Sequence, residues 1–393
     1  MMARMIPFAR SGVYLHFPYC LSKCPYCDFA SQVAPVVPHQ RYALAMLREL
    51  ELRAPAFAGR RVETIYVGGG TPSLWDPACL GQVLTALRAR LCVAPDAEVT
   101  LEANPGAADS ERFAAFKALG VNRLSIGMQS FDAGALRALG RTHSAAEAEA
   151  AFRAARDAGF QNVSLDLLYG SAGHQARTSA DDARRAVALG PEHLSAYALT
   201  LEAQAVEVPM AKQLREGTLA LPDEESTAGM GDAVRDVLRG AGYARYEISN
   251  YARGGQSSRH NALYWKGGEY LALGCGATGY RQTSGDVRAG GARYSNTRAA
   301  EGYMRALEEG RLAETTEALT ADDLFTERLM LGLRLTEGLD LGALCATFER
   351  DPELLLKRAK RLVVGGWATL HGARLTLTER GLDVHTEAAV RLI

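Results

Sequence analysis

The sequence has no uncharged apolar segment of the roughly 18 residues that a membrane-spanning helix needs, and no apolar run near its start that is typical of a secretory signal. It also has no excess of either charge, because 44 Lys and Arg residues oppose 45 Asp and Glu residues. A protein that binds nucleic acid usually shows a basic excess or clustered Lys and Arg. These absences predict a soluble cytoplasmic protein without a nucleic-acid partner.

Cysteine is also scarce, with seven residues in 393, but three of them lie close together. The segment HFPYCLSKCPYCDF at residues 16–29 contains Cys20, Cys24 and Cys27. The other cysteines are scattered, and we expect them to be buried core thiols: Cys79, Cys92, Cys275 and Cys345. The clustered thiols are therefore the first candidate site.

Short β-rich segments alternate with helical patterns along the first half of the chain. The expected strands are residues 12–17, 63–70, 97–105, 122–131, 162–170 and 192–200. The helical patterns between them cover residues 39–57, 80–91, 110–120, 145–159 and 179–190. This alternation predicts parallel βαβ units and an α/β fold, a partial (β/α)6 barrel of the TIM type.

In such a barrel the functional groups lie at the carboxyl ends of the strands. The cysteine segment follows the first expected strand, and polar or glycine residues follow or end the next ones: Gly68, Gly69, Gly70, Thr71, Glu102, Asn104, Gln129 and Asp166. A polar side chain inside an apolar strand is costly unless it is paired or used. The alternative for Glu102 and Asp166 is an ordinary buried carboxylate that is satisfied by hydrogen bonds.

The pattern changes twice in the second half of the chain. From about residue 201 to 316, Gly-rich and aromatic segments predict a substrate-facing extension of the barrel. From about 318, we expect amphipathic helices near 322–335 and 350–364, a hairpin around His371 and Gly372, and a last helix capped by Thr378. The predicted domains are residues 1–316 and 317–393, the second small, helical and winged-helix-like. It has no basic excess, which favours a packing role over nucleic-acid contact.

Three thiols in a CxxxCxxC pattern allow few uses. A structural zinc site is normally closed by four ligands, and His16 could complete one, but no second cysteine pair follows. The odd number of cysteines in a cytoplasmic chain disfavours a disulfide. The remaining interpretation is a 4Fe-4S cluster that is held at three irons and leaves the fourth open to a ligand.

The motif CLSKCPYC resembles the signature of the radical S-adenosylmethionine (SAM) superfamily. It is preceded by YLHFPYC and followed, in order, by CDF, GGGTPS, LEANP, RLSIGMQSF, LGRTH and LDLLYG. From about Gly12 onward the chain is similar to the branch that contains the anaerobic coproporphyrinogen III oxidases (HemN) and the HemW-like haem chaperones. The resemblance implies a radical SAM barrel with a HemN-type C-terminal domain and Cys20, Cys24 and Cys27 as ligands of a 4Fe-4S cluster.

The resemblance also implies which residues bind SAM. By the part of SAM that each is expected to contact, they are Tyr26 for the adenine, the backbone of Gly69, Gly70 and Thr71 for the methionyl end, Glu102 for the amine, Arg141 for the carboxylate, and Gln129 and Asp166 for the ribose hydroxyls, with Tyr14 in the same cofactor-binding set. These pairings suit the charges and hydrogen-bonding groups of the ligand. Taken alone, Arg141 would be a solvated surface charge.

Two features favour the chaperones over the oxidases. The oxidases resemble CxxxCxxCxC, whereas Asp28 and Phe29 follow Cys27 here. The segment HNALYW at residues 260–265 matches an HNxxYW motif that is characteristic of the HemW-like proteins, and makes His260 a candidate axial ligand of haem iron, ahead of His16 and Cys275. The alternative is a structural hydrogen-bonded corner that contains His260.

The resemblance therefore implies a chaperone that binds haem and transfers it to an acceptor such as a respiratory haem protein, with peripheral membrane association. The rival is an oxygen-independent coproporphyrinogen III oxidase of porphyrin biosynthesis, which uses a 5'-deoxyadenosyl radical. An RNA-modifying enzyme is disfavoured by the balanced charge. Ser171 and Ala172 replace the usual Leu-Pro pair, and Thr278 a usual histidine, in segments expected to face the substrate cavity.

Overall fold

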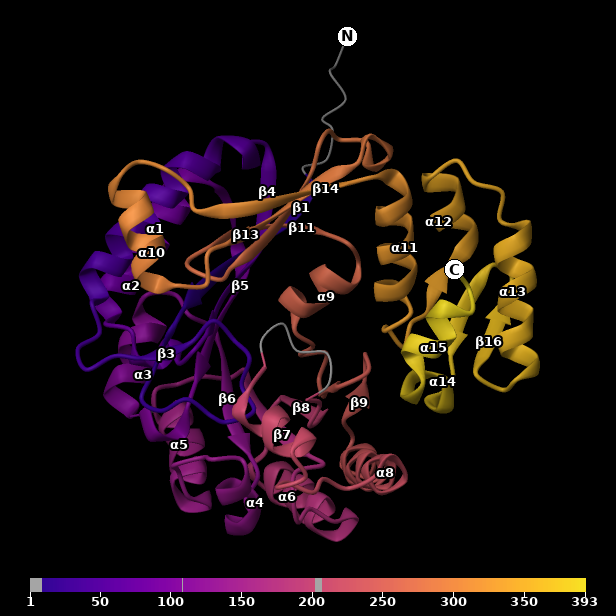
Figure 1. Cartoon of the computed structure of the whole chain (residues 1–393), viewed down its shortest axis with the longest axis horizontal. Coiled ribbons are helices and arrows are strands. Elements are labelled where there is room, and N and C mark those ends of the chain that lie inside the picture. The colour runs from indigo at the N-terminus through magenta and orange to yellow at the C-terminus, as the bar shows by residue number, and fades with distance from the viewer. Residues whose placement is uncertain (1–8, 108, 202–206) are drawn as a thin grey trace.

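The computed structural model describes residues 9–107, 109–201 and 207–393, and its largest element is a 12-stranded sheet. Six of its strands run parallel and lie in sequence order, as predicted for a partial barrel: β1 (Ala9–Phe17), β4 (Arg60–Gly69), β5 (Cys92–Ala103), β6 (Arg123–Gln129), β7 (Val163–Tyr169) and β8 (His193–Ala198). Among the described strands the sheet does not close, because β9 and β14 lie at its two edges. The expected α/β fold is therefore confirmed as an open, partial barrel (Figure 1).

Helices connect consecutive parallel strands and overlap every helical pattern expected between them. They are α1 (His39–Arg53), α2 (Pro77–Arg90), α3 (Ser110–Ala118), α4 (Ala133–Ala138), α5 (Ala145–Asp157) and α6 (Ala176–Leu189), with 3-10 turns η1 (Ala54–Phe57), η2 (Pro72–Leu74) and η3 (Pro105–Ala107). Side-chain caps fix several helix starts. Asp76 accepts from two amides of α2, and Ser144 and Glu147 form a capping box on α5. Gly190, in the left-handed conformation, ends α6.

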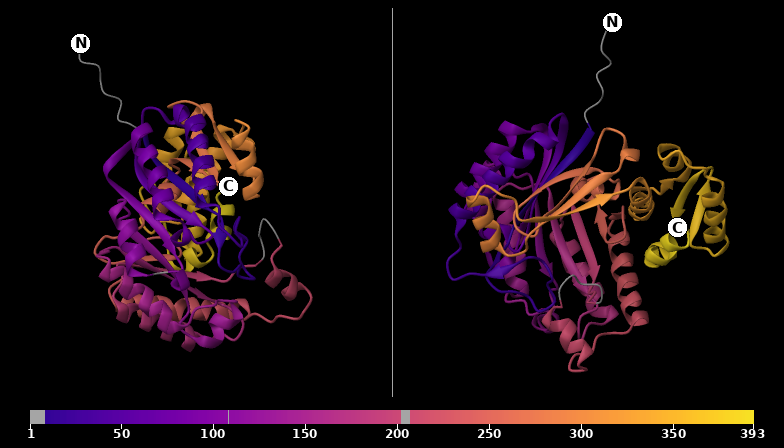
Figure 2. Two further views of the ribbon diagram at one scale, coloured as in Figure 1. Left: turned by 90° about the vertical axis from the view of Figure 1, so that its left-hand side faces the viewer. Right: turned by 45° about the horizontal axis from the view of Figure 1, so that its top comes forward.

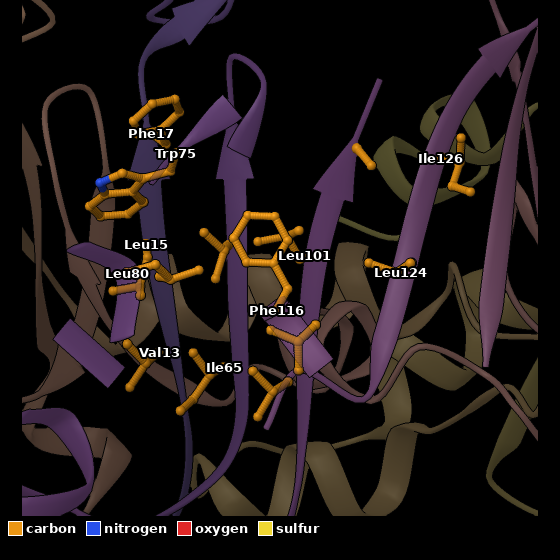
Figure 3. Packing of buried hydrophobic residues seen from close by; sticks show 14 of the residues in the cluster. Val13, Leu15, Phe17, Ile65, Trp75, Leu80, Leu101, Phe116, Leu124 and Ile126 are labelled. Atoms are coloured by element: carbon orange, nitrogen blue, oxygen red, sulfur yellow. The ribbon is translucent and has the colours of Figure 1, made fainter. Parts of the chain in front are cut away.

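The side chains of β1 alternate between two environments. Val13, Leu15 and Phe17 are buried in the core with side chains of the covering helices, among them Leu80 of α2 (Figure 3). Tyr14 and His16 therefore point to the other face of the strand, because successive side chains of a strand alternate. This period of two brings the polar residues of the strands to the inner face of the barrel.

An extension flanks the parallel strands on both sides. β11 (Glu269–Leu273) pairs with β1 and leads to β12 (Thr278–Gln282), β13 (Gly291–Asn296) and β14 (Glu314–Leu319), while β10 (Asn250–Ala252) and β9 (Ala244–Arg245) follow β8. Its helices are α7 (Pro209–Arg215), α8 (Glu224–Gly240), α9 (Arg259–Trp265) and α10 (Ala300–Glu308), with η4 (Val287–Ala289).

A buried polar network joins the extension to the barrel. The fully buried Glu49 of α1 accepts hydrogen bonds from Arg53 Nε at 2.7 Å, Asn296 Nδ2 at 2.7 Å and the Tyr303 hydroxyl at 2.6 Å. Arg53 and Asn296 are also buried. Since a buried charge is tolerated only when it is paired, this network fixes β13 and α10 against α1.

The C-terminal part is built around a second hydrophobic core, which also includes Tyr280 and Val287 of the extension, and it lies to one side of the large sheet (Figure 2). Its elements are α11 (Ala321–Gly332), β15 (Leu339–Asp340), α12 (Leu341–Thr347), α13 (Glu353–Val364), β16 (Ala368–His371), β17 (Arg374–Leu377), α14 (Glu379–Asp383) and α15 (His385–Val390). The expected hairpin and the Thr378 cap are present, and the element order of α11 to β17, with sheet order β15-β17-β16, is that of a winged helix. None of the helices in the described part of the chain has the length and apolar character to cross a bilayer.

Ion pairs hold the C-terminal part to the extension. Arg245 of β9 pairs with Glu379 at 2.6 Å, and Arg235 of α8 with Asp383 at 3.0 Å. The predicted division between residues 316 and 317 falls within β14 and stays a prediction.

Candidate functional site

The three clustered cysteines lie in a loop that is closed at its base. β2 (Tyr19–Cys20) pairs with β3 (Gln32–Val33), and the Gln32 amide donates to the Pro18 carbonyl at 2.8 Å. Lys23 Nζ donates across the loop to the Ser31 carbonyl at 3.0 Å. These contacts join the two ends of the loop just after the end of β1, and the loop is therefore tight.

The thiols face one cavity of about 300 Å³, and they differ in their surroundings. Burial raises the pKa of the Cys20 and Cys27 thiols, whereas the Cys24 sulfur accepts a hydrogen bond from Arg141 Nη1 at 3.5 Å. No three His, Cys, Asp or Glu side chains within residues 9–107, 109–201 and 207–393 are arranged to hold a single metal ion. Because metal ligation needs thiolates, occupancy of this loop must deprotonate these half-buried thiols.

The glycine segment after β4 passes directly behind the cysteine loop. Gly69 has a φ of +121°, and a Cβ there would lie 2.7 Å from His16 Cε1. The Gly70 amide donates to the Phe17 carbonyl at 2.7 Å and the Thr71 amide to the Tyr19 carbonyl at 2.9 Å. The amides of the segment are therefore used inside the protein, so that contacts to a ligand would come from other backbone atoms.

Glu102, near the end of β5, is the carboxylate closest in the fold to this glycine segment. Its Oε2 accepts from the Gly69 amide at 3.1 Å and its Oε1 from the Tyr66 hydroxyl at 2.8 Å. Burial raises the pKa of Glu102 to about 7. The two hydrogen bonds lower this pKa, but the effect of burial is larger. Glu102 makes no ion pair with another described residue, so its carboxylate is left for a cationic or N–H donor ligand.

Arg141 lines the same cavity. It is therefore not the solvated surface charge that its sequence position would predict without the family resemblance. Its Nη2 donates to Asn104 Oδ1 at 2.7 Å and to the Gly127 carbonyl at 3.0 Å. Its Nε is buried without a hydrogen-bond partner among the described residues. A buried donor without a partner is rare in proteins, and here it suits a ligand that carries a carboxylate.

Gln129 and Asp166 complete the cavity from β6 and β7. Gln129 has a φ of +67°, which costs a non-glycine residue of the order of 1 kcal/mol and is common where a site must aim a side chain. Asp166 accepts from Ser125 Oγ at 3.1 Å and from Ser164 Oγ at 3.4 Å, and burial raises its pKa. The Asp166 carboxylate therefore lies on the inner face of the sheet, where it could accept hydrogen bonds from the two hydroxyls of a diol.

The cavity brings together all of the predicted site residues except Tyr14 and His260: Cys20, Cys24, Cys27, Tyr26, Gly69, Gly70, Thr71, Glu102, Gln129, Arg141 and Asp166. Its donors and acceptors match a ligand with an amine, a carboxylate and hydroxyls. The residues present therefore fit a cluster held by three thiols together with SAM, although the contacts themselves stay predictions.

His260 has both ring nitrogens engaged. Nδ1 hydrogen-bonds to Thr64 Oγ1 at 2.8 Å and Nε2 to the Tyr264 hydroxyl at 2.7 Å, and the residue is 1% exposed. Burial lowers its pKa to about 3. This geometry is that of a structural corner; axial ligation by His260 stays a prediction and would require one of these hydrogen bonds to break.

The lesser candidates for haem ligation are also enclosed. His16 hydrogen-bonds to the Tyr14 hydroxyl and to the Ala30 carbonyl, both at 3.0 Å. Cys275 is fully buried and lies 3.6 Å from the Tyr42 hydroxyl. Among the scattered cysteines, Cys79 and Cys345 are buried as predicted, but the prediction for Cys92 was wrong, because it opens β5 at an exposed end of the strand.

Sequence reasoning missed several residues that line the cavity, above all Arg123. This arginine is 2% exposed and its Nε has no hydrogen-bond partner among the described residues, while its charge lowers the pKa of both Glu102 and Asp166. A charged residue at the start of the apolar strand RLSIGMQ was the available signal. Tyr66 and Ser125 also line the cavity. The only signal for them in the sequence was a polar side chain at an inward-facing strand position.

Ser171 and Thr278, two of the residues that depart from the usual sequence of this branch, lie in different parts of the structure. Ser171 is fully buried and its Oγ hydrogen-bonds to His174 Nδ1 at 3.1 Å. Thr278 hydrogen-bonds to Ser295 Oγ at 2.8 Å and lines a second cavity. Of these two residues, only Thr278 lies on a cavity wall together with the aromatic side chains of α9.

Comparison with known proteins gives matches along the whole chain. The model of the radical SAM superfamily matches residues 14–180, and that of the HemN C-terminal domain matches residues 319–384. The chain is 40% identical over 387 residues to the heme chaperone HemW of Mycobacterium tuberculosis (97% of this chain, 94% of the relative) and 35% identical over 378 residues to that of Escherichia coli (96% of each). The structure of the E. coli coproporphyrinogen III oxidase HemN, at 22% identity, has the same fold, with a TM-score of 0.81 over 99% of this chain and 91% of that one.

Proposed function

Because the chain belongs to the HemW family of radical SAM proteins, we propose that it is a haem chaperone, which binds haem and transfers it to an acceptor protein. The observation that carries this proposal is the 40% identity to a heme chaperone across 97% of the chain. Phe29 supports it, because the oxidases of the branch have a further cysteine two residues after the third, where this chain has Phe29 after Asp28.

We propose further that Cys20, Cys24 and Cys27 hold a 4Fe-4S cluster and that SAM lies beside it in the first cavity. When bound, a reduced cluster supplies an electron that can cleave SAM. The protein's part is binding and orientation. Glu102 would accept from the methionyl amine and the unpartnered Nε of Arg141 would donate to the carboxylate.

The remaining contacts follow from position in the cavity. Asp166 and Gln129 would bind the ribose hydroxyls, and Tyr26 would lie against the adenine. Thr71 and Gly70 would pack against the methionyl end, where the glycine leaves room. Exclusion of water by these walls would protect a reactive species from quenching.

The setting of this activity is also proposed. The protein would act in the cytoplasm and associate peripherally with the membrane when the acceptor is a respiratory haem protein. Residues 1–316 would form the radical SAM barrel with its extension, and residues 317–393 the HemN-type domain.

The test is an anaerobic assay of cluster-reconstituted protein in two arms. In the first, stoichiometric haem binding and transfer to an apo haem protein are followed by absorbance. In the second, SAM, a reductant and coproporphyrinogen III are supplied, and protoporphyrinogen is sought by chromatography. We expect transfer in the first arm and no product in the second. Product over many turnovers would make the chain an oxidase and defeat the proposal.

A further inference from the structure

A second cavity, of about 400 Å³, lies between the extension and the C-terminal part. It is lined by aromatic side chains of α9, β11 and β12, and by residues of α11. Its volume is within the range of small-molecule sites. It shares none of its lining residues with the cavity of the cysteines.

Rings in contact separate the two cavities. Tyr66, which lines the first cavity, stacks on His260 with 5.1 Å between ring centroids, and His260 meets Tyr264 edge-on at 4.8 Å. Tyr264 and Tyr14 line the second cavity. The HNALYW segment therefore lies between the two cavities, and its Tyr264 and Trp265 face the second one.

The walls of the second cavity form a continuous aromatic surface. Tyr264 and Tyr270 meet edge-on with centroids 4.6 Å apart, and Tyr270 and Tyr280 lie 6.2 Å apart. Aromatic rings in such offset and edge-to-face arrangements favour planar, polarisable ligands. A flexible apolar chain would gain less from these fixed rings.

Two polar atoms in this wall are buried without a hydrogen-bond partner among the described residues. They are the Trp265 Nε1 and the Tyr280 hydroxyl, and Tyr280 is 5% exposed. An indole N–H can only donate. Because buried donors are almost always satisfied, these atoms indicate a ligand that brings acceptor oxygens into an aromatic cavity.

A cation without a carboxylate partner lies on the same wall. The guanidinium of Arg328, on α11, lies 5.7 Å from the Phe348 ring centroid and makes no ion pair with a described residue. The other charged residues of the wall neutralise each other, because Arg293 pairs with Glu327 at 2.5 Å. Arg328 is thus the group of this wall that is suited to a carboxylate.

We propose that the second cavity binds the haem, with its macrocycle against Tyr264, Tyr270 and Tyr280 and its propionates on Arg328, Trp265 Nε1 and the Tyr280 hydroxyl. This assignment rests on the proposed function, and it identifies a cargo site apart from the cluster. Since Arg328 is on α11, the C-terminal part supplies one wall of the site, and its displacement would open the cavity for transfer.

The test compares haem titrations of the full-length, cluster-reconstituted wild type with Arg328→Met and Tyr280→Phe. The matched control is Arg361→Met, which removes an exposed arginine of α13. A charge-assisted hydrogen bond corresponds to a change of about tenfold to a hundredfold in dissociation constant, and a neutral one to about fivefold. We expect these losses for Arg328→Met and Tyr280→Phe and no change for Arg361→Met. Iron and sulfide content should stay at wild-type level throughout.

A second probe separates the propionates from the ring. Protoporphyrin IX dimethyl ester lacks free carboxylates, so its affinity should be the same for the wild type and Arg328→Met. Stoichiometric haem binding that neither Arg328→Met nor Tyr280→Phe weakens would overturn the cavity assignment and leave the proposed function intact. A wild type that does not bind haem would overturn both. If Arg328→Met does not fold, Tyr280→Phe alone decides between these outcomes.

Discussion

Gly70→Ala should disturb the cysteine loop without adding or removing a charge. A Cβ on Gly70 would lie 2.8 Å from the Tyr19 carbonyl oxygen and 2.9 Å from the Cys20 sulfur. Both distances are shorter than ordinary contacts, and one of the atoms belongs to the backbone. The segment that carries Cys20 must therefore move away from the end of β4.

The expected cost follows from overpacking, which typically destabilises a protein by about 1–3 kcal/mol. The matched control is Gly229→Ala in α8, where a Cβ would meet no atom within 4 Å. Alanine is the better helix former, so this control should stabilise the protein by about 0.5–1 kcal/mol. The same chemical change thus has opposite signs at the two positions.

Two measurements check the prediction. Urea unfolding followed by circular dichroism gives the change in the free energy of unfolding, and iron and sulfide analysis after anaerobic reconstitution gives the cluster content. Gly70→Ala should lose stability and cluster, and Gly229→Ala neither. A Gly70→Ala protein that unfolds at the wild-type urea midpoint and takes up wild-type iron would refute the close packing inferred behind Cys20.

Other single changes test the buried polar groups and the ligands. Glu49→Ala should lower the free energy of unfolding by about 3–5 kcal/mol, because it removes one of the two carboxylates that pair with the buried Arg53, the other being Glu314, and also the acceptor of the buried Tyr303 hydroxyl; a urea titration showing no loss would contradict this. The pKa of Glu102 is raised to about 7, so its carboxylate gains charge as the pH rises through about 7, and SAM affinity relative to Glu102→Gln, measured by equilibrium dialysis, should rise over that interval. Parallel pH profiles would exclude a role for its charge. Cys24→Ala should abolish the visible absorbance of the reconstituted cluster, and wild-type iron and sulfide content would rule out Cys24 as a ligand.

The parallel strands could be predicted because the residue pattern within each strand agrees with its burial in the final fold. Val13, Leu15 and Phe17 alternate with Tyr14 and His16, so that the period of two is visible in the sequence. The helices between them bury one face, and several of them end at glycines, as α6 does at Gly190. Local pattern and final burial agree in this half of the chain, and the predicted positions are therefore close to those observed.

The extension could not be located in the same way, because its pairings are not local. β11 lies beside β1 although more than 250 residues separate Ser11 from its partner Glu269, and β10 has only three residues. Neither strand carries a pattern long enough to predict. The second cavity depends on these pairings, since β11 and β12 bring Tyr270 and Tyr280 toward Tyr264, and so it could not be predicted from the motifs.

The separation of the two cavities bears on the choice between chaperone and oxidase. A reaction that takes hydrogen from a tetrapyrrole needs the reacting atoms about 3–3.5 Å apart, so the tetrapyrrole and SAM would have to share one cavity. Here Tyr66 stacks on His260, and His260 meets Tyr264 edge-on, so that these three rings lie between the cavities and the second cavity faces α11 rather than the cysteines. Such an arrangement suits binding and release. We therefore expect haem and SAM to bind together, each changing the dissociation constant of the other by less than about twofold, whereas mutually exclusive binding would mean that both occupy the first cavity.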